Sequence, residues 1–149
     1  MAIWEEVERA APELVREVRE AFAVRKHATL ATLRRDGGPR ISGTEVEFTE
    51  TGVFVGSMPG ALKALDLRRD PRFALHSPTV DPPADDPGAW AGEAKIAGWV
   101  EELSDPSSVA EAHRFQLHVD EVVHTRVANN RLEITSWHEG RGVSVRTRD

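Results

Sequence analysis

One stretch, residues 53–72, most constrains the fold, because a buried strand, a tight turn and a short helix follow each other directly. Val53-Phe54-Val55 are strand-forming residues, and the small residues Gly56-Ser57 end the run. Pro59 suits the first position of a helix, where its missing N–H is not needed. Asp70-Pro71 ends that helix. The stretch therefore predicts a strand that turns straight into a helix.

The start of this helix could hold an anion. A helix start presents unpaired backbone N–H groups and the positive end of the helix dipole. Lys63 lies in the first turn, and Gly60 allows close approach to the backbone. A phosphate held by Ser57, the turn amides and Lys63 is one interpretation. The simpler alternative is a capped surface helix with one solvated lysine.

Composition limits the classes of partner. The 149 residues suit a single domain (1–149) that can bury a core, and 30% charged with 40% hydrophobic residues is typical of a soluble globular protein. The net charge of −6 argues against nucleic acid and against an anionic membrane. Cysteine is absent, so disulfides and thiolate metal sites are excluded. Without a secretion signal or an apolar span, the expected location is cytoplasmic.

The N-terminal segment, residues 1–24, is expected to be helical, because apolar residues recur at steps of three and four. Pro12 is expected to split it into two helices. Residues 28–33 and 40–48 then predict a hairpin around the turn at 36–39. One face of the second strand is polar at its beginning and apolar at its end, as expected where a strand runs from a core into a pocket; it carries Arg40, Ser42, Thr44, Val46 and Phe48.

The rest of the chain predicts more strands around one long loop. The proline-rich loop 77–90 is expected to be functional or mobile. The other expected elements are strands at 72–76, 91–103, 119–127, 132–137 and 143–147, and a helix opening at Asp105-Pro106 with Val109, Ala112 and Phe115 on one side. Gly98 is expected to form a bulge or a bend. Alternation places Trp137 on a polar face with Glu133 and Thr135, as an interface residue or a stacking surface.

Self-sufficient catalysis is not expected. His113 and His118, five apart on the expected helix, point in different directions, and no histidine spacing predicts a metal site. The chain has no Gly-x-Ser-x-Gly or Walker sequence and no tyrosine, so no catalytic side chain is assigned. Any enzyme chemistry would therefore come from a bound cofactor.

Taken in order, four stretches resemble the pyridoxamine 5′-phosphate oxidase-like family of flavin and deazaflavin proteins. They are Thr29–Leu33 with Asp36-Gly37 and Pro39-Arg40; Val55–Gly60 through Lys63 and Leu67 to Asp70-Pro71-Arg72; Gly98 with Glu101; and Trp137–Gly142. The match covers roughly residues 25 to 148. Each motif is weak alone, and the ordered set is what carries the resemblance.

The resemblance implies a mainly β (α+β) protein, a six-stranded antiparallel Greek-key split β-barrel with an N-terminal helix and two rim helices. It also implies a homodimer with the flavin in the groove between subunits. Carried over by position, Arg40, Ile41 and Ser42 would flank the flavin ring. Ser57 and Lys63 would bind its phosphate, while Trp137 and Arg141 would reach the site from the partner chain.

Two departures argue against a true pyridoxamine phosphate oxidase. That enzyme has Ser and Arg just before its phosphate-binding Lys, where this chain has Ala61 and Leu62, and its C-terminal Arg-x-His has no counterpart in residues 142–146. The expected cofactor is FMN, with the deazaflavin coenzyme F-420 as the alternative. The long acidic tail of the deazaflavin needs further cations, which could come from Arg40, Arg68, Arg69, Arg72 and Arg141; the net charge of −6 works against it.

Two functions remain open. The first is an oxidoreductase that transfers hydride between bound FMN, or a deazaflavin, and a small organic substrate. The second is a flavin- or haem-binding dimer without turnover, acting as a carrier or sensor, and a barrel that has lost its ligand is a lesser third. The first two differ in whether a substrate reaches the flavin, and this depends on the loop 77–90.

Overall fold

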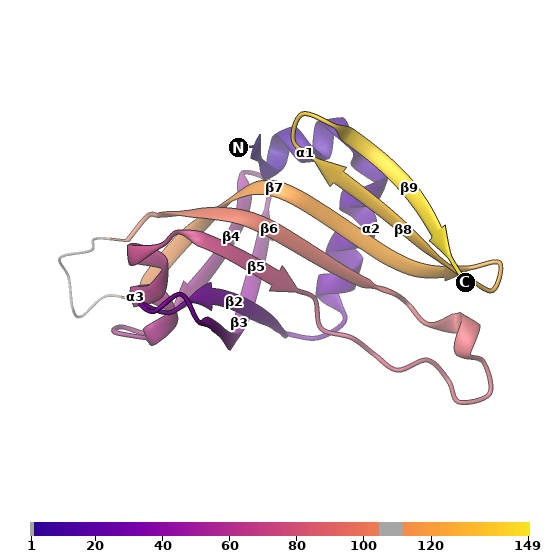
Figure 1. Cartoon of the computed structure of the whole chain (residues 1–149), viewed down its shortest axis with the longest axis horizontal. Coiled ribbons are helices and arrows are strands. Elements are labelled where there is room, and N and C mark those ends of the chain that lie inside the picture. The colour runs from indigo at the N-terminus through magenta and orange to yellow at the C-terminus, as the bar shows by residue number, and fades with distance from the viewer. Residues whose placement is uncertain (1, 105–111) are drawn as a thin grey trace.

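The computed structural model describes residues 2–104 and 112–149, and this part of the chain is mainly β (Figure 1). The helices are α1 (Trp4–Ala10), α2 (Pro12–Ala23), α3 (Leu62–Arg69) and the 3₁₀ turn η1 (Pro87–Ala89). The strands are β1 (Ala2–Ile3), β2 (His27–Leu33), β3 (Pro39–Thr49), β4 (Gly52–Ser57), β5 (Arg72–His76), β6 (Glu93–Glu102), β7 (His113–Ala128), β8 (Arg131–His138) and β9 (Gly142–Arg148).

Six of these strands close into an antiparallel barrel, which confirms the expected fold class. Their order is β4-β3-β2-β5-β6-β7, and pairing of β4 with β7 completes the circle. The 16-residue strand β7 is the longest and also pairs with β1 and β8. Strands β8 and β9 continue the sheet beyond the barrel, as Figure 1 shows.

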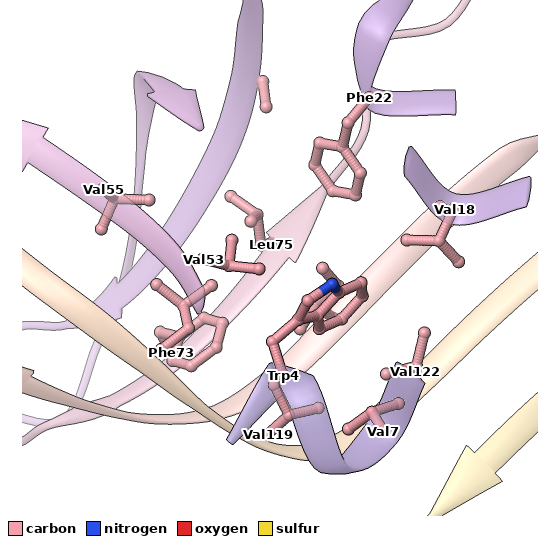
Figure 2. Packing of buried hydrophobic residues seen from close by; sticks show 14 of the residues in the cluster. Trp4, Val7, Val18, Phe22, Val53, Val55, Phe73, Leu75, Val119 and Val122 are labelled. Carbon is pink, nitrogen blue, oxygen red and sulfur yellow. The ribbon is translucent and has the colours of Figure 1, made fainter. Parts of the chain in front are cut away.

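The two N-terminal helices pack against the barrel and supply part of its core. Pro12 opens α2, so the predicted split at this residue is confirmed. The Trp4 side chain is fully buried among residues of both helices and of the strands (Figure 2). Its ring lies edge-on to Phe48 of β3, with 5.5 Å between the ring centroids. Burial of an aromatic side chain of this size fixes the N-terminal segment onto the sheet.

The predicted bulge at Gly98 is confirmed. The register of β6 against β7 shifts between Ala97 and Gly98. A Cβ atom at Gly98 would collide with the backbone carbonyl oxygen of His118 on the neighbouring strand. Only glycine lets the two backbones approach this closely.

The prediction of a helix after Asp105 is wrong for the residues from Ala112 onward, which the structure describes. Residues 105–111 lie outside the described part, Ala112 is not helical, and strand β7 begins at His113. Phe115, Leu117 and Val119 alternate into the core, which is the period of a strand. His113 and His118 are therefore on opposite faces of one strand, not on a helix.

The predicted start of α3 is also wrong. The helix begins at Leu62 with Ala61 as its cap, so Pro59 lies in the preceding turn. Gly60 separates the two with a φ of +72°, a left-handed conformation that cannot belong to the helix. Lys63 nevertheless lies in the first turn, as expected. Among the described residues, no helix combines the length and the apolar character needed to cross a membrane.

Candidate functional site

A groove opens where strands β3 and β4 separate. Their pairing covers only residues 46–49 of β3 and 52–55 of β4, and beyond it the two strands diverge. The groove has a volume of about 1010 Å³, which is sufficient for a cofactor. Its lining comes from the start of β2, from β3, β4, the turn after β4, the start of α3 and the start of β7.

Lys63 spans this opening. From the first turn of α3, its Nζ donates a hydrogen bond of 2.8 Å to the backbone carbonyl oxygen of Gly43 on β3. Burial lowers the pKa of the Lys63 ammonium group, because desolvation disfavours the charged form. The carbonyl is a neutral partner, and no carboxylate of the described residues pairs with the ammonium group of Lys63 at this end of the groove. An anionic ligand would supply that counter-charge.

Ser57 ends β4 in the lining of the same groove. Its Oγ is buried and has no hydrogen-bond partner among the described residues. A buried hydroxyl without a partner costs free energy, about 1–3 kcal/mol, so such groups usually have a ligand or a water. Ser57 and Lys63, predicted as a pair, are therefore brought to one groove by the fold.

His113, at the start of β7, also lines the groove, and no pattern in the sequence predicted its place there. Its ring is almost fully buried and its Nε2 accepts a hydrogen bond of 3.1 Å from the backbone N–H of Gly60. Its Nδ1 lies 3.4 Å from a carboxylate oxygen of Glu102. Both carboxylate oxygens of Glu102 accept hydrogen bonds from Arg68. The Gly60 amide, expected to be open to a phosphate, is thus already bonded.

Arg40, expected beside a flavin ring, forms an ion pair with the buried carboxylate of Asp66. Its Nε donates to Asp66 of α3 at 2.7 Å, and Thr32 and Arg69 donate to the same carboxylate at 2.8 and 3.0 Å. Burial opposes ionisation of Asp66, but these three donors outweigh it and lower the pKa of Asp66. Arg40 is not among the groove-lining residues.

The other predicted site residues do not line the groove within one chain. Ile41 is 74% exposed on the outside of β3, and Ser42 is half-buried on the other face of that strand. Arg141 is exposed in the turn between β8 and β9. Trp137 is 6% exposed and belongs to the hydrophobic core, so its expected place on a polar surface is wrong. Whether these residues contact a cofactor in an assembly stays a prediction.

The charges in the groove nearly balance. Its cationic side chains are Lys63 and Arg114, and its carboxylates are Glu45 and Glu47. Arg114 lies over the Phe54 ring at 4.4 Å and 3.8 Å from a carboxylate oxygen of Glu47. Three of the arginines weighed for a long acidic tail are paired elsewhere, Arg68 with Glu102, Arg69 with Asp66 and Arg72 with Asp70.

Solved structures of other proteins have a similar arrangement of strands. No family model and no curated protein sequence matches the chain. A pyridoxamine 5′-phosphate oxidase-related, FMN-binding protein from Nostoc punctiforme superposes with a TM-score of 0.62 at 11% identity, over 95% of this chain and 96% of that one. The chain has the split-barrel fold of the pyridoxamine 5′-phosphate oxidase-like proteins.

Two further structures share this split-barrel fold. PhzG from Burkholderia lata, solved in complex with tetrahydrophenazine-1-carboxylic acid, gives a TM-score of 0.62 at 13% identity, covering 95% of this chain and 89% of that one. A heme binding protein from Mycobacterium smegmatis gives 0.57 at 14% identity, covering 92% and 88%. Identities this low establish the fold alone, and the fold accommodates different cofactors.

Proposed function

We propose that this chain binds FMN, with the flavin phosphate in the groove between β3 and β4. The observation that carries the proposal is the buried Oγ of Ser57, which has no hydrogen-bond partner in the described part of the chain and lies in a groove that Lys63 also lines. A phosphate oxygen would accept a hydrogen bond from each of them, and charge-assisted bonds of this kind are the stronger ones. The protein from Nostoc punctiforme, which has the same fold, is FMN-binding, and this supports the same cofactor.

The charges favour FMN over the deazaflavin. FMN ends in a single phosphate, which Lys63 and Ser57 can bind. The acidic tail of the deazaflavin needs a row of available cations, but Arg68, Arg69 and Arg72 each bind a carboxylate of this chain. Among the described residues, the groove lining holds as many carboxylates as Lys and Arg side chains.

When bound, the flavin would supply the redox chemistry, and the chain would act as an oxidoreductase on a small organic substrate. The role of this chain is to hold and orient the cofactor. Lys63 and Ser57 fix its phosphate, and His113 holds the Gly60 turn beside them through the 3.1 Å hydrogen bond. The PhzG structure, which has the same fold and was solved with a small organic acid bound, supports a small organic molecule as the substrate.

A haem-binding protein without turnover is the second candidate. The observation that favours it is His27, which lines the groove with a side chain 71% exposed and is thus accessible as an iron ligand. The heme binding protein of Mycobacterium smegmatis and the heme storage protein HutZ of Vibrio cholerae, which matches with a TM-score of 0.54, have the same fold.

A homodimer completes the proposal. Ala31, Ala74 and Ala97 lie in one row across β2, β5 and β6, on the outside of the barrel, and Ile41 continues the row on β3. This row of apolar side chains suits a second copy of the chain. Ala74→Arg should therefore reduce the mass measured by light scattering to that of one chain. Ala23→Arg, on an exposed position of α2, is the matched control and should leave the dimer intact.

The cofactor is tested by the visible spectrum of freshly purified protein, followed by titration of the apoprotein with FMN, the deazaflavin and haem. Tightest binding of FMN, followed by reduction of the bound flavin by NADPH, would support the proposed oxidoreductase. A dominant haem absorption band that disappears in His27→Ala would instead support the second candidate. Absence of binding by all three would overturn both.

A further inference from the structure

A second pocket lies at the other end of the molecule from α3. Its volume is about 390 Å³, and it shares no lining residue with the groove between β3 and β4. Figure 1 shows α3 at one end of the long axis and the loop with η1 at the other. The pocket is bounded by α2, by the end of β7 and by the loop 77–90, through Val80 and Trp90. The proline-rich loop thus forms one wall of a separate cavity.

A buried histidine supplies the polar group of this pocket. His124 on β7 has a side chain only 6% exposed, and its Nδ1 lies 3.0 Å from a carboxylate oxygen of Glu17 on α2. In the neutral ring, Nδ1 carries the hydrogen that faces Glu17, and Nε2 is left as an acceptor. No hydrogen bond to Nε2 is found within the described residues.

Gly92 lies directly beside this acceptor. Its φ of +90° favours glycine, and a Cβ atom there would lie 2.5 Å from the backbone carbonyl oxygen of Thr125 and 3.2 Å from Nε2 of His124. Burial is the main reason that the pKa of His124 is lowered, with Arg126 lowering it further against the opposing charges of Glu17, Glu20 and Glu133. The ring therefore stays neutral, and Nε2 stays an acceptor, at neutral pH.

The remaining lining combines apolar side chains with charged groups at the rim. Six of its side chains are apolar: Ala21, Val24, Val80, Trp90, Ala91 and Val127. Arg16 pairs with Glu20 and Arg126 with Glu133, while the carboxylate of Glu17 faces the neutral ring of His124. An anionic ligand would find no unpaired cation among these groups, so the lining disfavours an anion.

From this geometry we propose that the pocket between α2, β7 and the loop 77–90 is a second binding site, for a neutral aromatic molecule that donates one hydrogen bond to Nε2 of His124. The aromatic body packs against Trp90 and the valine side chains, and Glu17 orients the imidazole. The site is independent of any cofactor in the groove between β3 and β4.

The probes are 4-methylphenol and 4-methylanisole, which share a ring, a para methyl group and an oxygen; the anisole has an O-methyl group in place of the hydroxyl donor. Calorimetry and ligand-observed NMR at pH 7.5 should show saturable binding of 4-methylphenol, with 4-methylanisole about fivefold weaker, the size expected for one hydrogen bond. The ¹⁵N chemical shift of His124 Nε2 should move with 4-methylphenol alone. Equal affinity for the two probes, or no saturable binding, would overturn the proposal.

Two variants separate the hydrogen bond from the apolar wall. His124→Gln should reduce the affinity for 4-methylphenol about fivefold and remove its preference over 4-methylanisole. Trp90→Ala, in the loop, should reduce the affinity for both probes equally. This variant still tests the site if His124→Gln does not fold. His138→Gln is the matched control, because His138 also binds a carboxylate, that of Glu121 at 2.7 Å, but lies outside this pocket. Unchanged affinity in both test variants would contradict the assignment.

Discussion

Two polar clusters flank α3, and they differ in whether their partners are present. At the C-terminal half of the helix, the carboxylate of Asp66 accepts hydrogen bonds from Arg40, Thr32 and Arg69. At the helix start, the buried Oγ of Ser57 has no partner within the described residues, and Lys63 binds only a neutral carbonyl. The first cluster is complete within the chain and holds the helix on the barrel. The second is incomplete, which is the property expected of a ligand site.

Removing the centre of the complete cluster should have the largest effect. Asp66→Ala leaves the cation of Arg40 buried without its partner, so the free energy of unfolding should fall by roughly 3–5 kcal/mol. Urea denaturation measures this change. The matched control is Asp70→Ala, which removes a carboxylate that pairs with Arg72 at the surface and should change the stability far less. Equal losses in the two variants would mean that the cluster around Asp66 has no special role.

Lys63→Ala should leave stability nearly unchanged and reduce flavin affinity. Loss of one charge-assisted hydrogen bond to the phosphate, about 1.5–3 kcal/mol, corresponds to a decrease of tenfold or more. Fluorescence titration of the apoprotein with FMN measures it. Lys95→Ala, on an exposed position of β6 outside the groove, is the control and should bind like the wild type. Unchanged affinity in Lys63→Ala would remove Lys63 from the site.

Acid should weaken the complete cluster selectively. The pKa of Asp66 is lower in the folded chain than its ordinary value, so its contribution is present above about pH 4 and is lost as the pH falls through the folded pKa. The difference in unfolding free energy between the wild type and Asp66→Asn should therefore be largest at pH 7 and shrink below about pH 4. A difference that stays constant between pH 7 and pH 3 would show that Asp66 is not stabilised as a carboxylate.

Ser57→Ala should have the smallest effect, and in opposite directions on the two properties. Removing a buried hydroxyl without a partner should leave the stability of the apoprotein unchanged or slightly higher. Removing one neutral donor to the phosphate, about 1 kcal/mol, should weaken FMN binding about fivefold. Thermal denaturation and FMN titration measure the two quantities. A clear loss of apoprotein stability would indicate that Ser57 has a structural partner instead.

Local patterns in the sequence predicted the local elements. Pro12 divides the N-terminal helices, Gly98 forms the bulge, and the pair Ser57 and Lys63 lies in one groove. These features depend on the conformational preferences of a few neighbouring residues, so a single sequence contains the signal. The six-stranded barrel came from the ordered set of motifs, and its closure by β4 and β7 is confirmed.

Features that depend on residues far apart in the chain were missed. Phe115 has helix-compatible neighbours, and only its pairing with Val55 and Glu102 makes it part of a strand. Trp137 alternates with polar residues, yet the core of the barrel buries it. The binding of His113 to Gly60 depends equally on how β7 meets the turn before α3. No local pattern contains that information.

The long strand β7 also has a consequence for the order of folding. Its first residues pair with β4, which lies far away in the sequence, and contacts of this kind are formed slowly because a long loop must close first. The hairpins β2–β3 and β7–β8 need no such closure and can form early. The groove takes its walls from β3, β4 and β7, so it exists only after the barrel has closed. In a refolding experiment, flavin binding should therefore recover at the rate of barrel closure. Most of the circular dichroism signal of the β-sheet should return before that step.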